Sequence, residues 1–122
     1  MNNSVIIDGV RSPIGLKNGK IVGMRADDLG SDVVKKLLER NSLIDKQIID
    51  DLVLGCAFPE GTQGMLISKG VSILAGLPIT TAAKVVNRFC GSSMDSVHQV
   101  SQSIVSGDCL SGIAAGVEDM FQ

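Results

Sequence analysis

The order of strand-like and helix-like segments is the feature that most restricts how this chain can fold. Short apolar, β-branched runs alternate with longer segments whose apolar residues recur every three or four positions. The predicted strands are residues 5–7, 52–54, 82–87 and 109–115. Because strands separated by helices are joined by crossover connections, this order predicts an α/β fold with a mostly parallel sheet in αβα layers.

Three helices are expected between these strands. Asp27 or Asp28 is predicted to cap the first helix, whose apolar residues share one face and which ends near Asn41. The second is expected over residues 62–75 and the third over residues 92–106, and a glycine follows each of them. The sequence contains no internal repeat and no low-complexity linker, so a single domain over residues 1–122 is expected.

The third predicted helix has an unusual composition. Asp95 is its only formally charged residue, and serine is its most frequent one. Since exposed helices usually carry more Lys and Glu, we expect this helix to be buried between two layers. The alternative is an amphipathic surface helix that turns Val97, Val100 and Ile104 toward the core.

Composition and charge exclude several functional classes. The formal net charge is −2 with scattered Lys and Arg, and aromatic residues make up only 2% of the chain, so neither a basic footprint nor a stacking platform for nucleic acid is expected. No apolar run approaches the roughly 20 residues of a membrane helix. The N-terminus lacks the pattern of a signal peptide. We therefore expect a cytoplasmic protein without nucleic-acid or membrane partners.

The three cysteines are expected to be reduced thiols. Cys56, Cys90 and Cys109 form no CxxC pair, and an odd number outside a secretory context does not indicate a disulfide framework. With one histidine in the chain, no metal site is expected. Cys56 and Cys109 adjoin or begin predicted strands and are interpreted as core residues.

Cys90 is the strongest candidate for a catalytic nucleophile among the three cysteines. It lies between a predicted strand and the start of the third helix, where the helix dipole and unpaired N–H groups stabilise a thiolate. Gly91 leaves room for a substrate carbonyl, and backbone N–H groups at this end are candidate donors to a developing oxyanion. The alternative is that Cys90 is a buried small apolar residue, as many free cysteines are.

The single histidine cannot act as the base for Cys90 within this helix. His98 lies eight residues further along, which corresponds to about 12 Å along the helix axis. Hydrogen-bond reach is only about 3 Å. If Cys90 is a nucleophile, its general base is expected from sequence outside these 122 residues.

Several separated motifs together resemble the thiolase family. Residues 86–94, VNRFCGSSM, resemble the segment around the thiolase nucleophile, and GD at 107–108 and GVEDM at 116–120 follow in the family's order. DGVRSPIG at 8–15 and LGC at 54–56 also have the family's pattern. Residues 114–116, AAG, depart at Ala115 from the Ala-Gly-Gly that is common there in the family. The resemblance covers essentially the whole chain.

The resemblance implies an acyltransferase that uses coenzyme A thioesters as substrates and needs no further cofactor. Such enzymes cleave 3-ketoacyl-CoA or run the reverse Claisen condensation, and Cys90 matches the cysteine that carries the acyl group, with its N–H as an oxyanion donor. Family members are about three times as long and form dimers or tetramers. The resemblance therefore implies an incomplete N-terminal half, without loop domain, C-terminal domain or activating histidine, that is inactive or nearly so alone.

Two other interpretations stay open from the sequence. Another condensing enzyme of the same fold, similar to a ketoacyl synthase, would also place a cysteine at this position, although the sequence around Cys90 favours a thiolase. A non-catalytic fragment that acts by association would instead use an open sheet edge, with residues 82–87 as the pairing strand.

Overall fold

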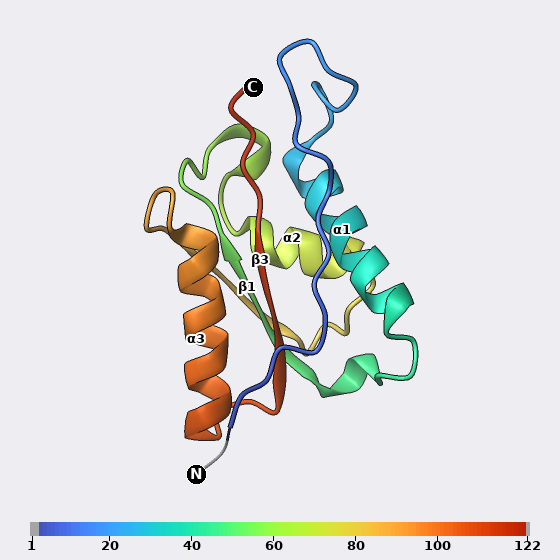
Figure 1. Cartoon of the computed structure of the whole chain (residues 1–122), viewed down its shortest axis with the longest axis vertical. Coiled ribbons are helices and arrows are strands. Elements are labelled where there is room, and N and C mark those ends of the chain that lie inside the picture. The colour runs from blue at the N-terminus through green and yellow to red at the C-terminus, as the bar shows by residue number, and fades with distance from the viewer. Residues whose placement is uncertain (1–2, 122) are drawn as a thin grey trace.

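The computed structural model describes residues 3–121 and contains a three-stranded parallel sheet. Its strands are β1 (Ile49–Gly55), β2 (Ala82–Val86) and β3 (Ser111–Gly116), and β1 lies between the other two (Figure 1). β1 pairs along its length with β3 and through Asp51–Gly55 with β2. The three strands therefore end at the same edge of the sheet.

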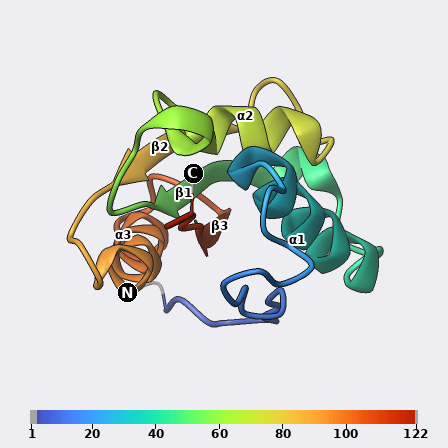
Figure 2. The ribbon, with the colours of Figure 1, turned by 90° about the horizontal axis from the view of Figure 1, so that it is seen from above.

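Helices cover both faces of this sheet, which confirms the predicted α/β layers. α1 (Ala26–Arg40) packs against α2 (Ile67–Leu74), and α3 (Ser92–Ser106) packs on β1 and β3 (Figure 2). The connection through α2 runs from β1 to β2, whereas α3 leads back across β1 to β3. Because both crossovers are expected to be right-handed, this reversal places α2 and α3 on opposite faces.

The core is built on β1, whose Leu52, Val53 and Leu54 are at most 1% exposed. An uninterrupted apolar run of this kind is typical of a central parallel strand that is buried on both faces. Leu52 and Leu54 join a cluster that includes Val71 of α2 and Val34 of α1. No helix among residues 3–121 is long and apolar enough to cross a membrane.

The predicted strand at residues 5–7 is wrong. Val5, Ile6 and Ile7 belong to no strand and are 71–83% exposed. High β-propensity forms a strand only where a neighbouring strand completes the hydrogen-bond ladder, and this segment pairs with none. It is held by side chains instead: the hydroxyls of Ser4 and Ser101 lie 2.6 Å apart, and Asp8 accepts hydrogen bonds from α1's C-terminal end.

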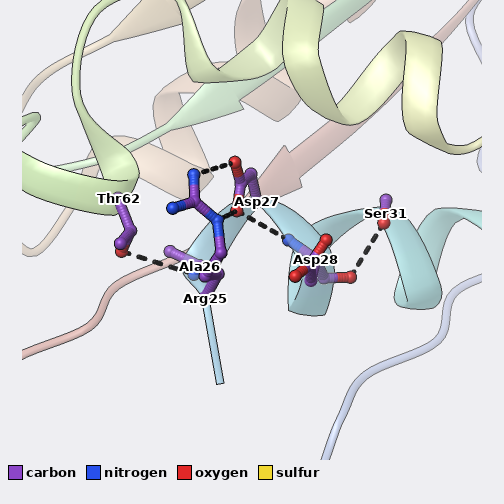
Figure 3. A network of polar contacts seen from close by, with 6 residues as sticks. All are labelled: Arg25, Ala26, Asp27, Asp28, Ser31 and Thr62. Atoms are coloured by element: carbon purple, nitrogen blue, oxygen red, sulfur yellow. Dashed lines mark hydrogen bonds and ion pairs between the residues drawn. The ribbon is translucent and has the colours of Figure 1, made fainter. Parts of the chain in front are cut away.

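α1 begins before the predicted caps. Its N-cap is Arg25, and Asp27 pairs with the Arg25 guanidinium at 2.7 and 3.0 Å instead of capping (Figure 3). This pair holds the pKa of the Asp27 carboxyl below its usual range. Two acidic residues in the first turn still complement the helix dipole. The predicted end at Asn41 is confirmed, since Asn41 is the C-cap.

The second helix is shorter than predicted. A 3₁₀ turn, η2 (Gly61–Gln63), comes first, and α2 begins only at Ile67. Gln63 is fully buried, and its side chain bonds to groups on other segments, while Met65 has a φ of 53°. These tertiary contacts and the left-handed residue interrupt the helical pattern that the sequence suggests.

The third helix has the predicted bounds but not the predicted burial. Only its sheet-facing residues Ser92, Ser96 and Val100 are buried, whereas Met94 and Val105 are 65% and 43% exposed. Within the described chain the sheet covers α3 on one side only, as in the amphipathic alternative. Of the three residues which that alternative turned toward the core, only Val100 is buried, while Ile104 is half-buried and Val97 is 37% exposed. Gly107, at φ 85°, ends the helix as the sequence predicts.

The first turn of α3 lies directly on two strand ends. A Cβ built on Gly55 would overlap the backbone of Ser92 and Ser93, and one built on Gly116 would overlap the Ser93 side chain. Because glycine has no side chain at these two positions, α3 can approach β1 and β3 closely at the sheet edge.

We expect Gly55→Ala to destabilise the protein by about 1–3 kcal/mol, because the new methyl group meets backbone that cannot rotate away. The matched control is Gly70→Ala in α2, where a Cβ meets nothing within 4 Å. That change should stabilise the helix by about 0.5–1 kcal/mol. Urea unfolding midpoints of the two variants measure the difference, and equal midpoints would contradict the close packing.

Candidate active site

Cys90 lies in the turn between β2 and α3, at the sheet edge where the parallel strands end. It is the exposed cysteine of the chain, while Cys56 and Cys109 are buried. The interpretation of Cys56 and Cys109 as core residues is confirmed, and the alternative of a buried Cys90 is wrong. The role of Cys90 as a nucleophile stays a prediction at this point.

The turn that carries Cys90 is tight. The Gly91 N–H donates to the Arg88 carbonyl oxygen and the Ser92 N–H to that of Phe89, both at 3.0 Å. Phe89 has a φ of 46°, in the left-handed region that residues other than glycine seldom adopt. Since the Gly91 and Ser92 N–H groups are engaged in the turn, these two are not open donors for an oxyanion, contrary to the general expectation for this helix end.

Two side chains fasten the turn. The Ser92 hydroxyl donates to the Phe89 carbonyl oxygen at 2.6 Å and accepts from the Arg88 N–H at 2.8 Å. The Asn87 side chain accepts from the Phe89 N–H and donates to the Ala57 carbonyl oxygen, each at 2.9 Å. The position of Cys90 is thus tied both to α3 and to the loop that follows β1.

A cavity of about 470 Å³ opens at Cys90. Its wall includes Cys90, Phe58, Phe89, Val117, Glu118 and Met120. The rings of Phe58 and Phe89 lie 6.3 Å apart at 51°, so an aromatic pair lines the cavity together with Cys90. A second cavity of about 280 Å³ beside α1 contains no cysteine or histidine in its wall. The mostly apolar cavity at Cys90 is therefore the better site for a ligand.

Glu118, which also lines this cavity, binds the loop that follows β1. Its carboxylate accepts from the N–H groups of Ala57 and Phe58, at 2.7 and 3.2 Å, and from the Gln63 amide at 3.0 Å. Gln63 in turn accepts from the Asp119 N–H at 2.7 Å. The segments after β1 and after β3 are thereby joined by one polar network.

The buried cysteines are poorly suited to nucleophilic chemistry. Burial, and then the charge of Glu118, raises the pKa of Cys56 to about 11. Burial also raises the pKa of Cys109, with a further contribution from Asp50. Both side chains therefore remain neutral thiols at physiological pH.

The single histidine does not line the cavity at Cys90. His98 is exposed on α3. Within residues 3–121, no three His, Cys, Asp or Glu side chains lie close enough to hold a metal ion.

Sequence reasoning did not single out Glu118, Gln63, Asn87 or Ser92. A usable signal was present, because polar residues that directly follow parallel strands converge at one sheet edge. Asn87 directly follows β2, and Glu118 follows β3 by one intervening residue. Gln63 carried no such signal, since its role depends on how the loop after β1 folds.

Comparison with known proteins shows the family of the chain. The family model described as "Thiolase, N-terminal domain" matches residues 4–122. The chain belongs to the thiolase family. It is 46% identical to "3-ketoacyl-CoA thiolase" of Marinomonas sp. (strain MWYL1) and 40% identical to "Beta-ketoadipyl-CoA thiolase" of Escherichia coli, in each case over 98% of this chain.

This thiolase chain spans about a third of its relatives' length. The alignment covers 31% of the Marinomonas protein, 30% of the Escherichia coli protein and 31% of a "3-ketoacyl-CoA thiolase" from Aliivibrio salmonicida (strain LFI1238), to which the chain is 46% identical. The resemblance noted in residues 86–94 and 116–120 is therefore confirmed as family membership.

We expect iodoacetamide to modify the folded thiolase chain once, at Cys90, near neutral pH. Cys90 is exposed, whereas Cys56 and Cys109 are buried and their pKa values are raised. In denaturant all three cysteines should react. Intact mass and peptide mapping distinguish these outcomes, and early modification of Cys56 in the native chain would contradict the structure.

Proposed function

We propose that the protein containing this chain is an acyltransferase that cleaves 3-ketoacyl-CoA thiolytically, or runs the reverse Claisen condensation, through an acyl group on Cys90. The observation that carries this proposal is the position of Cys90. It is an exposed thiol beside an apolar cavity, between a parallel strand and a helix N-terminus, in a chain whose relatives bear thiolase names.

In the proposed cleavage, the Cys90 sulfur attacks the 3-keto carbon and forms a sulfur–carbon bond. The bond between C2 and C3 then breaks, and the departing carbon takes up a proton as acetyl-CoA leaves. The thiol of a second coenzyme A attacks the thioester on Cys90, releases the shortened acyl-CoA and returns the cysteine to its thiol form. The Cys90 N–H is the proposed donor to the oxyanion in these steps.

The proton transfers require a group that this chain does not supply. His98 lies six residues into α3, about 9 Å along the helix axis from the end that follows Cys90, and is exposed. We therefore propose that the base comes from sequence beyond these 122 residues and that the isolated chain is nearly inactive. Loss of a nucleophile's partners commonly lowers turnover by several orders of magnitude.

The proposed substrates are coenzyme A thioesters, without a further cofactor, and the proposed setting is fatty acid β-oxidation in the cytoplasm. The full-length protein is proposed to be a homodimer or tetramer. β2 supports this assembly, because it lies at an edge of the sheet in the described chain and has an unpaired side. The thiolase names of the relatives favour this function over a ketoacyl synthase-like enzyme.

Acetyl-CoA should transfer an acetyl group, about 42 Da, to Cys90. We expect mass spectrometry to find this adduct on a version of the chain extended to the length of its relatives, and to find little on the 122-residue chain. The Cys90→Ala variant of each is the control. No adduct on the extended protein would contradict the assignment of Cys90 as the residue that carries the acyl group. As much adduct on the 122-residue chain as on the extended protein would contradict the proposed external base.

A further inference from the structure

We propose that Asn87 and Ser92 are positioning residues for Cys90, acting together as a clamp on the turn that presents its sulfur. We call these two side chains, with their hydrogen bonds to residues 88, 89 and 57, the turn clamp. This inference rests on the proposed function, because it assigns the clamp a part in acyl transfer to Cys90.

Ser92 closes the turn from the side of α3. Its side chain is buried, with 4% of the residue exposed, and its hydroxyl is used both as donor and as acceptor. The two partners, the Arg88 N–H and the Phe89 carbonyl, lie immediately before Cys90 in the chain. The hydroxyl therefore joins the entry of the turn to the first residue of the helix.

Asn87 holds the turn from the side of the strand. Its amide oxygen accepts from the Phe89 N–H, and its amide nitrogen donates to the Ala57 carbonyl oxygen. Ala57 belongs to the loop whose N–H groups Glu118 binds, and both Ala57 and Glu118 line the cavity. The Asn87 side chain therefore fixes the shape of the turn through Phe89 and fixes its position against the cavity wall through Ala57.

The backbone at Phe89 shows why such a clamp is needed. A φ of 46° is unfavourable for a phenylalanine, and such residues persist where surrounding contacts over-determine the conformation. Both backbone polar groups of Phe89 are bound by clamp side chains: the N–H by Asn87 and the carbonyl by Ser92. The clamp acts on the residue directly before the nucleophile.

This positioning matters more for acyl transfer than for simple thiol reactivity. Attack on a thioester needs the sulfur, the carbonyl carbon and the oxyanion donor in a defined arrangement, and small displacements of catalytic groups are costly. A small alkylating reagent that contacts the exposed sulfur can orient itself freely. The clamp should therefore change the ratio of the two rates, which a loss of folding stability alone would not do.

The test measures two rates at Cys90 by mass spectrometry, in the version of the chain extended to the length of its relatives. One is acetylation by a short thioester, S-acetyl-N-acetylcysteamine, and the other is alkylation by iodoacetamide. We expect Ser92→Ala and Asn87→Ala to lower the ratio of acetylation to alkylation about tenfold or more. Asn87→Asp keeps the acceptor for the Phe89 N–H and loses the donor to Ala57, so its ratio should fall less.

Ser96→Ala is the matched control. Ser96 is also a buried serine of α3, one turn further along, and its hydroxyl donates to backbone carbonyls of Ser93 and Ala115. Its loss should lower the melting temperature and leave the rate ratio unchanged. Asn87→Asp serves as the milder variant if Ser92→Ala does not fold.

If the wild-type protein is acetylated at Cys90 but the folded clamp variants keep its ratio of acetylation to alkylation, the role of the clamp is overturned and the proposed function is not. A fall in Ser96→Ala as large as that in Ser92→Ala would also overturn the role of the clamp, because the effect would then follow stability. No acetylation of Cys90 in the extended wild-type protein would overturn the proposed function and, with it, this role of the clamp.

Discussion

The close approach of α3 to two glycines at the sheet edge is the contact on which the site depends. Gly55 ends β1 and Gly116 ends β3, and neither leaves room for a Cβ beneath Ser92 and Ser93. A helix seated this closely brings its N-terminus to the edge where parallel strands end, the usual place for ligands in α/β sheets. Cys90, two residues before α3, is thereby presented at the cavity.

Polar side chains also hold this edge of the sheet together. The Glu118 carboxylate binds the loop after β1, and the buried Gln63 amide binds both that loop and the segment after β3. A carboxylate that accepts backbone N–H groups satisfies donors that would otherwise be costly to leave without partners. Hydrogen bonds therefore join the loops at the same edge of the sheet where Cys90 is exposed.

Predictions from sequence were good where local pattern and structure share one cause. The bounds of α3 and the position of β1 follow from helical periodicity, from Gly107 and from the apolar run around Val53. The prediction failed at residues 5–7 because a strand needs a partner that propensity does not supply. It placed Cys90 at a helix start, but the contacts of Gln63 depend on tertiary folding and left no local signal.

Gly116→Ala, made in the version of the chain extended to the length of its relatives, tests the dependence of the site on the close approach of α3 most directly, through the rate of Cys90 acetylation by the short thioester. We expect the rate to fall about tenfold or more, since the added methyl group displaces Ser93 and with it the first turn of α3. Adding Ser93→Gly, which removes the overlapped side chain, should restore much of the rate. An unchanged rate in Gly116→Ala, or a loss that Ser93→Gly does not relieve, would contradict the account.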